Sequence, residues 1–108
     1  IVYNLRHDSL TGLLNRLYFK ETCERFLADG TGGAFLMIDI DWFKKINDQY
    51  GHPAGDRTLI SFSESLKSVV SPKDLTGRIG GDEFTLFLAD INQKSEIEDF
   101  LEMLKSDW

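Results

Sequence analysis

The chain has 108 residues, which is enough for one domain built around a single modest hydrophobic core. Its 18 Asp and Glu side chains outnumber 12 Lys and Arg, so the formal net charge is −6, and this balance excludes a nucleic-acid-binding surface. The single cysteine excludes an internal disulfide, and no apolar run is long enough to span a membrane. We therefore expect a cytoplasmic domain that makes no membrane contact itself. Because the chain opens on Ile1 instead of Met, we also expect a longer parent protein, which a membrane anchor could hold.

Helix and strand patterns alternate along the first half of the chain. Residues 13–28 carry apolar side chains at helical spacing, and glycines follow at positions 30, 32 and 33. Residues 34–40 are nearly all apolar, which predicts a central strand buried on both faces. Residues 43–50 predict a short helix that stops at Gly51.

The second half begins with a longer helix and ends with another. Pro53 can open a helix whose apolar positions continue to residue 69 or 70. Two short segments, residues 75–79 and 85–89, flank Gly80-Gly81 with its two acidic residues and predict a hairpin. The capping box formed by Ser95 and Glu98 predicts the start of the last helix.

The order of these elements, α-β-α-α-β-β-α, predicts the fold class. It indicates an α/β (α+β) domain of the ferredoxin-like or polymerase-palm type, with a central, mainly antiparallel sheet flanked by helices. A βαββαβ unit closes with a further strand after its second helix. We therefore expect the last strand of the full domain to be absent from a chain that stops at Trp108.

Two acidic clusters at predicted strand ends carry the chemistry. Asp39-Ile40-Asp41 follows the apolar strand, where α/β folds commonly place ligand sites. In Gly80-Gly81-Asp82-Glu83-Phe84, the glycines accept positive φ and let the backbone approach a ligand, while the carboxylates project from the turn. Carboxylates from two strands are the minimum set for metal-assisted phosphoryl or nucleotidyl transfer, and so acidic a protein needs metal ions beside a phosphate ligand.

Each of these residues also has a simpler structural explanation when taken alone. An isolated Asp39 would cap the following turn, and Gly80-Gly81 followed by two acids would form an ordinary hairpin. His52 beside Pro and Gly would be a solvated loop residue, and Asn47 and Asp56 would be cap and turn residues. These explanations are separate for each position, whereas one site accounts for all of them together.

Four motifs in order resemble the GGDEF domain of diguanylate cyclases. They are, in chain order, Asp8-Ser9-Leu10-Thr11-Gly12-Leu13-x-Asn15-Arg16, residues 39–48, Tyr50-Gly51-His52-x-x-Gly55-Asp56 and residues 80–84. The resemblance covers essentially the whole chain. It implies condensation of two GTP molecules into cyclic di-GMP with release of pyrophosphate. It also implies a single GGDEF domain over residues 1–108, truncated at its C-terminal end, with residues 1–7 the stub of a linker from an upstream sensory or regulatory domain.

The resemblance implies roles for individual residues. Mg²⁺, or Mn²⁺ in its place, would be held by the side chains of Asp39 and Asp82 and by the backbone carbonyl of Ile40, oxygen ligands that suit a hard cation. Catalysis would fall to Asp82 or Glu83 as the acceptor of the ribose 3′-hydroxyl proton, with Asp82 favoured by the resemblance, and to Lys44 beside the phosphates. The substrate GTP would be bound by Asn47, His52, Asp56, the backbone N–H groups of Trp42 and Phe43, and the close-approach glycines Gly80 and Gly81.

Two departures from the family pattern carry expectations of their own. The family commonly has an inhibitory product site with an Arg-x-x-Asp motif upstream of the hairpin, and here those positions read Ser71-Pro72-Lys73-Asp74. We expect no inhibition through that site, because Lys73 cannot reproduce the planar fork of Arg. Family domains also continue with a further strand and a helix that carries basic residues. We therefore expect this chain to turn over GTP weakly or not at all and to expose an open strand edge.

The product has two-fold symmetry, so the resemblance implies a second copy of the domain in a transient or parent-imposed homodimer. A different class of function is a non-catalytic module that binds GTP or cyclic di-GMP and regulates a neighbouring domain. A third is a metal-dependent glycosyltransferase, in which Asp39-x-Asp41 would bind a sugar nucleotide, but residues 80–84 have no role in that scheme.

Overall fold

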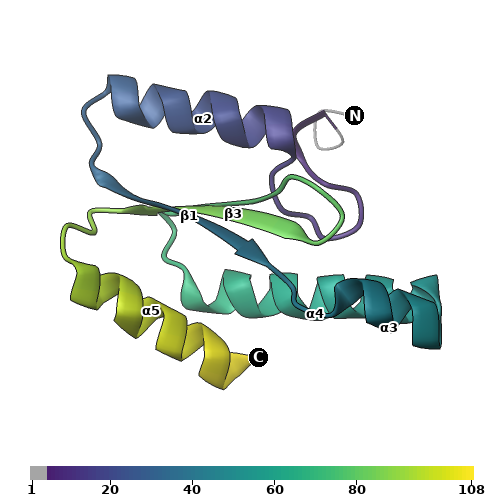
Figure 1. Ribbon diagram of the computed structural model, residues 1–108. Coiled ribbons are helices and arrows are strands. Elements are labelled where there is room, and N and C mark those ends of the chain that lie inside the picture. The colour runs from purple at the N-terminus through teal and green to yellow at the C-terminus, as the bar shows by residue number, and fades with distance from the viewer. Residues whose placement is uncertain (1–4) are drawn as a thin grey trace.

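The computed structural model describes residues 5–108, and its elements follow the predicted order (Figure 1). The strands are β1 (Gly33–Asp39), β2 (Leu75–Arg78) and β3 (Glu83–Ala89), and the helices are α2 (Arg16–Ala28), α3 (Phe43–Tyr50), α4 (His52–Val69) and α5 (Lys94–Asp107). Helix α2 covers one face of the sheet and helices α4 and α5 cover the other, while α3 lies beside α4 beyond the end of β1 (Figure 1). The predicted α+β class with a flanked antiparallel sheet is confirmed.

The three strands form an antiparallel sheet in the order β1-β3-β2. Strand β3 is therefore central, and six of its seven residues are buried. Along β1 the register runs from Gly33 opposite Ala89 to Asp39 opposite Glu83. Leu14 adds two backbone hydrogen bonds to the outer edge of β2, to Thr76 (3.1 Å) and from Arg78 (3.0 Å).

The expectation that residues 34–40 form the central strand, buried on both faces, is wrong. Exposed and half-buried residues alternate along β1, and Phe35 and Met37 are 56% and 59% exposed. Leu36 and Ile38 point to the opposite face and pack on the main core. The physical reason lies in the coverage: α2 packs over β2 and β3, so the α2 side of β1 is left largely open.

The sheet separates two hydrophobic clusters. Alternate residues of β3 point to opposite faces, so Phe84, Leu86 and Leu88 join the main core under α4 and α5, whereas Phe87 and Ala89 face α2. The main core contains Leu13, Ile40, Leu59, Phe62, Leu66, Phe84, Leu86, Leu88, Phe100 and Leu104. The smaller cluster contains Phe19, Cys23, Phe87 and Ala89, so the single cysteine is a packed side chain.

Two predicted helix starts are corrected. Helix α2 begins at Arg16, not at residue 13, because the Asn15 side chain accepts a hydrogen bond from the Tyr18 N–H (2.9 Å) and caps the helix there. The predicted capping box of Ser95 and Glu98 is wrong. The N-cap of helix α5 lies two residues earlier, at Gln93, which makes no side-chain capping bond.

None of the helices in residues 5–108 is long and apolar enough to cross a membrane. Residues 1–4 of the predicted linker stub lie outside the described residues. Leu5 and Arg6 are helical, and a wide loop follows, in which His7 forms a backbone bridge with Leu14.

Candidate active site

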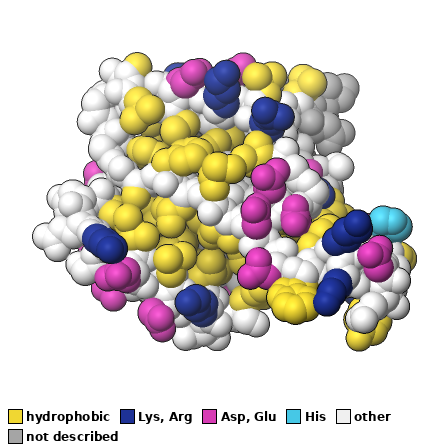
Figure 2. Space-filling model, in the orientation of Figure 1, with side chains coloured by type: hydrophobic (Ala, Val, Ile, Leu, Met, Phe, Trp, Pro, Cys, Tyr) yellow, Lys and Arg dark blue, Asp and Glu magenta, His cyan; other side chains and the backbone are white. Residues whose placement is uncertain are grey.

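The two acidic motifs lie at the same end of adjacent strands. Asp39 closes β1 directly opposite Glu83, the first residue of β3, and the Ile40 N–H donates a hydrogen bond to the Asp82 carbonyl (3.2 Å). Asp39 and Glu83 are exposed and Asp82 is half-buried. Asp and Glu side chains gather at this end of β1, next to Lys or Arg side chains over α3 (Figure 2). The predicted proximity of the two strands is confirmed.

The turn between β2 and β3 is closed by backbone hydrogen bonds to one carbonyl. The N–H groups of Ile79 (3.0 Å) and Gly80 (3.5 Å) both donate to the Glu83 carbonyl. The expected positive φ is absent from Gly80 and Gly81, because the positive-φ glycines of the described residues are at positions 12, 30 and 51. A Cβ at Gly80 would lie 2.7 Å from Glu83 Oε1, the far end of a flexible side chain.

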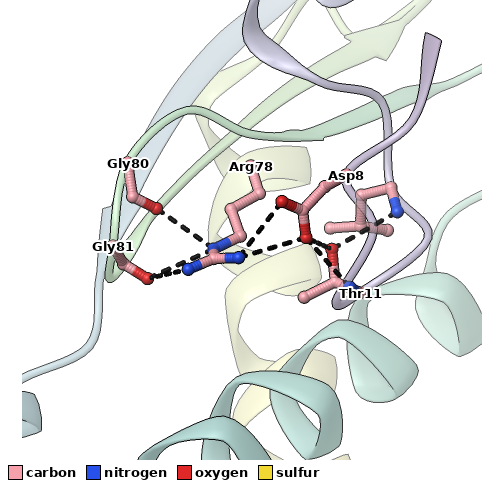
Figure 3. A network of polar contacts seen from close by, with 6 residues as sticks. Asp8, Thr11, Arg78, Gly80 and Gly81 are labelled. Atoms are coloured by element: carbon pink, nitrogen blue, oxygen red, sulfur yellow. Dashed lines mark hydrogen bonds and ion pairs between the residues drawn. The ribbon is translucent and has the colours of Figure 1, made fainter. Parts of the chain in front are cut away.

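A charged network that the sequence reasoning missed holds this turn in place (Figure 3). The Arg78 guanidinium donates to the carbonyl oxygens of Gly80 and Gly81 and to both carboxylate oxygens of Asp8. Asp8 in turn accepts hydrogen bonds from the Thr11 N–H and hydroxyl. The spacing Asp8-x-x-Thr11 is a sequence signal for such a turn, but the pairing with Arg78, 70 residues away, depends on the fold.

Helix α3 starts immediately after the acidic motif of β1. Trp42 precedes the helix with φ 68° and ψ 11°, a left-handed conformation that is uncommon for a residue with a side chain, and it makes no side-chain capping bond. The Trp42 ring is exposed, and Lys45 Nζ lies 4.3 Å from its centroid. Lys44 is exposed and Phe43 is half-buried against the main core. This arrangement places the expected phosphate-binding backbone beside the acidic strand ends.

Asn47 packs between α3 and α4. Its Oδ1 is buried and has no hydrogen-bond partner, alone in this respect among the buried side-chain polar atoms of residues 5–108. It lies against the backbone of Gly55, because a Cβ at Gly55 would overlap it. His52 and Asp56 lie on the first turns of α4 and are exposed. The structure thus brings Asn47 next to the residue that precedes Asp56.

A hollow of about 290 Å³ adjoins the acidic end of β1. Asp39 and Asp41 line it together with apolar side chains from β1, α4 and α5, and Lys105 adds a positive charge at its edge. Asn47, His52 and Asp56 are not part of this lining. The predicted residues therefore form two groups, an acidic group at the strand ends and a polar group on α3 and α4.

The described residues contain no cluster of three or more His, Cys, Asp or Glu side chains arranged to hold a metal ion. The strand ends offer a smaller donor set, the Asp39 carboxylate with that of Asp82, the residue before β3, and nearby backbone carbonyls. That set fits Mg²⁺, which keeps several waters and takes only one or two protein carboxylates together with substrate phosphates.

Comparisons with known proteins identify relatives over most of the chain. The family model described as "Diguanylate cyclase, GGDEF domain" matches residues 5–107. Cyclic di-GMP phosphodiesterase NbdA of Pseudomonas aeruginosa is 44% identical over 95 residues, which are 84% of this chain and 12% of NbdA. Diguanylate cyclase TpbB of the same species is 41% identical over 93 residues, which are 82% of this chain and 21% of TpbB.

Solved structures show the same fold. The GGDEF domain of TpbB superposes with a TM-score of 0.86 and 36% identity, covering 94% of this chain and 61% of that one. The GGDEF domain of DgcB from Caulobacter crescentus, solved in complex with c-di-GMP, gives a TM-score of 0.83 with 29% identity and the same coverage. The chain therefore spans 61% of each of these solved chains and between 12% and 21% of the two curated relatives.

Proposed function

This chain belongs to the GGDEF domain family of diguanylate cyclases, and from that premise we propose that it is a nucleotidyltransferase that condenses two GTP molecules into cyclic di-GMP. The observation that carries the proposal is the pairing of Asp39 with Glu83 across β1 and β3, beside the Ile40–Asp82 backbone bond. It gathers carboxylates that are 44 positions apart in the sequence at one exposed rim, as metal-assisted nucleotidyl transfer requires.

In the proposed reaction the ribose 3′-oxygen of one GTP attacks the α-phosphorus of the other. A new P–O bond forms, the bond to the leaving pyrophosphate breaks, and the proton of the 3′-hydroxyl passes to Asp82 or Glu83. The same exchange in the opposite direction closes the ring. Mg²⁺ or Mn²⁺, when held by Asp39, Asp82 and the Ile40 carbonyl, would supply positive charge at the triphosphate. Lys44 would add a positive charge near the phosphates.

The polar group on α3 and α4 is the proposed base pocket. The orphaned Oδ1 of Asn47 supports this role, since an unsatisfied buried acceptor costs free energy and calls for an explanation. Asn47, His52 and Asp56 would bind guanine and ribose, because amide and carboxylate oxygens accept from guanine N–H groups. The backbone of Trp42 and Phe43 would receive phosphate oxygens, and Gly80 and Gly81 would allow close approach of the substrate.

The proposal requires two copies of the domain. Each copy would hold one GTP, and the two-fold symmetric product indicates two half-sites related by a C₂ axis. The acidic rims repel each other, so the encounter would be transient or held together by other parts of the protein. The specific rate, which is the rate per mole of chain, should therefore rise with chain concentration. A specific rate that stays constant down to nanomolar dilution would contradict this requirement.

A second candidate function is that of a non-catalytic module that binds GTP or cyclic di-GMP. Two relatives at 44% and 43% identity are cyclic di-GMP phosphodiesterases, and the matched region is only 12% and 10% of their length. The activity in their names therefore need not lie in this region. In such a protein the domain would act on a neighbouring one.

Incubation with GTP and Mg²⁺, followed by chromatographic analysis of the product, separates the two candidates. The protein should be used in the longest form that its gene encodes. We expect cyclic di-GMP and pyrophosphate, a loss of at least about a hundredfold in rate for Glu83→Gln or Asp39→Asn, and no change for the control Asp99→Asn on α5. Saturable GTP binding without product would favour the regulatory module, and neither binding nor product would refute both.

A further inference from the structure

The turn that carries the acidic residues is fixed by one side chain. Arg78 Nε lies 3.1 Å from the Gly80 carbonyl oxygen and 3.2 Å from that of Gly81, and Nη2 lies 3.0 Å from the latter (Figure 3). Nη1 is directed away from the turn and reaches Asp8, with distances of 3.1 and 3.2 Å to its two oxygens. One planar guanidinium thus joins two consecutive turn carbonyls to a carboxylate that lies 70 residues away.

The Asp8 end of this network is also fixed. Its Oδ2 accepts from the Thr11 N–H (2.9 Å) and hydroxyl (2.8 Å), and its backbone carbonyl accepts from the Gly12 N–H (2.8 Å). The Asp8 N–H donates to the Leu13 carbonyl (2.7 Å), which closes the wide loop that precedes α2. The loop is therefore a stiff support for the carboxylate.

The ion pair between Arg78 and Asp8 is shielded from water, unlike a typical surface ion pair. The side chains of Arg78 and Asp8 are 17% and 20% exposed, whereas those of the pair Lys73–Asp90, at the other end of the β2–β3 ladder, are 57% and 67% exposed. Shielding from water strengthens a charged contact and restricts the geometries that both partners can adopt.

We propose that Asp8 and Arg78 are positioning residues, which hold the turn at residues 79–82 against the N-terminal loop and thereby set the place of Asp82 and Glu83. The roles of Asp82 and Glu83 in this proposal rest on the proposed function. The tether, which is the network from Asp8 through Arg78 to the turn, does not. Asp82 directly follows the two glycines whose carbonyls Arg78 holds, and Glu83 follows Asp82. A displacement of the N-terminal loop therefore reaches the acidic rim through this guanidinium, in addition to the backbone bonds between Leu14 and β2.

The chemistry of the contact requires arginine. Three nitrogen atoms of one rigid plane serve Gly80, Gly81 and Asp8 together, whereas a lysine ammonium is a point donor that can keep the ion pair but not the whole set. Arg78→Lys and Asp8→Asn therefore keep most of the side-chain volume. Each removes a different part of the hydrogen-bond network that joins Asp8, Arg78, Gly80 and Gly81. Lys73→Gln is the matched control, because it breaks an exposed ion pair, with Asp90, in the turn that precedes β2.

Hydrogen exchange of the backbone amides, measured by mass spectrometry on the whole chain, tests the tether directly. We expect exchange in residues 79–83 to accelerate at least about tenfold in Arg78→Lys and in Asp8→Asn, with protection retained in the centre of β3. The double variant should accelerate exchange no more than the stronger single variant, because both changes break one network. Lys73→Gln should exchange like the unchanged chain. Unaltered exchange at residues 79–83 in both single variants would overturn the proposal.

Kinetics test the consequence for the acids. In an active protein both variants should lower kcat about tenfold or more while KM for GTP changes less than threefold, because misplaced catalytic groups affect the transition state more than binding. Faster exchange with unchanged kcat would overturn the positioning role. If the unchanged protein makes no product, the proposed function fails separately. The affinity for Mn²⁺ alone, measured by electron paramagnetic resonance, then takes the place of kcat: weaker binding in both variants supports positioning, and equal binding overturns it.

Discussion

Single carboxylates serve different purposes in this chain according to what surrounds them. Asp39 and Glu83 stand exposed at the strand ends, whereas Asp8 and Asp74 are occupied by hydrogen bonds within the fold. Partial burial of Asp8 opposes its ionisation, but hydrogen bonds from Thr11 and the charge of Arg78 outweigh this and lower its pKa below the ordinary 3.8. Asp8 thus acts as a structural anion.

The lowered pKa of Asp8 predicts how its contribution to stability depends on pH. A carboxyl group with a folded pKa below its unfolded value stabilises the fold above the unfolded value, and this stabilisation is lost as pH falls through the folded pKa. Asp8→Asn should therefore lower the free energy of unfolding by about 1–2 kcal/mol at pH 7. The difference should persist to about pH 5 and disappear below the lowered pKa. Urea unfolding at a series of pH values measures it, and a difference independent of pH down to pH 2 would contradict the charge argument.

Asp74 is the acidic residue of the upstream motif, Ser71 to Asp74, through which we expect no inhibition by the product. Its Oδ1 accepts from the Ala89 N–H (2.8 Å), and its Oδ2 accepts from the Ser71 N–H (2.9 Å) and hydroxyl (3.1 Å). With both oxygens engaged and Ser71 in place of the family's Arg, no planar cation is available there to bind cyclic di-GMP. Asp74→Ala should cost about 1–3 kcal/mol of stability and leave cyclic di-GMP binding, measured by calorimetry, unchanged. Tight product binding that this variant abolished would refute the expectation.

At the scale of elements, the contact between α3 and α4 depends on a missing side chain. Gly55 is buried, and a Cβ there would overlap Asn47 Oδ1 and lie 3.4 Å from Phe43 Cε1. Gly55→Ala should therefore displace Asn47 or separate the helices, at a cost of about 1–3 kcal/mol. If the proposed base pocket is correct, GTP affinity should fall as well. Gly32→Ala is the matched control, because a Cβ there meets nothing within 4 Å. Thermal unfolding and nucleotide titration measure the stability and the GTP affinity of both variants. Equal stability of Gly55→Ala and Gly32→Ala would contradict the packing argument.

At the scale of the whole molecule, β1 is the exposed edge of the sheet described here. Hydrophobic side chains form one patch between α2 and the sheet and another between the sheet and α5 (Figure 2). Phe35 and Met37 are exposed on the α2 side of β1. An edge strand with exposed hydrophobic side chains tends to pair with other chains. We therefore expect this 108-residue chain to associate through β1 in solution.

A charge on the edge should prevent that association. Met37→Lys should shift the mass measured by analytical ultracentrifugation towards a monomer, because a lysine on an edge strand disfavours pairing. Met103→Lys makes the same substitution on α5 at a residue of similar exposure, 55% against 59%, and should leave the mass unchanged. A monomeric unchanged chain at about 100 μM would contradict the expectation.

Local patterns in the sequence were sufficient for the elements and for the two acidic strand ends. Apolar spacing and turn residues act over a few neighbours, so the order of helices and strands and the hairpin at residues 75–89 could be predicted. The same rules placed two helix starts wrongly, because Asn15 caps α2 after residue 13 and no side chain caps α5. Local rules thus predict that an element exists better than where it begins.

By itself the sequence determined the fold class from short-range patterns, and four ordered motifs determined the family and, through the resemblance, the proximity of the Asp39 strand to the hairpin. Only the tertiary structure decided that β3, not β1, is the buried centre of the sheet, because burial depends on how far α2 and the other helices extend over each strand. It also decided that Arg78 reaches Asp8. A contact across 70 residues is set by the packing of the loop before α2 against β2, which no local spacing encodes.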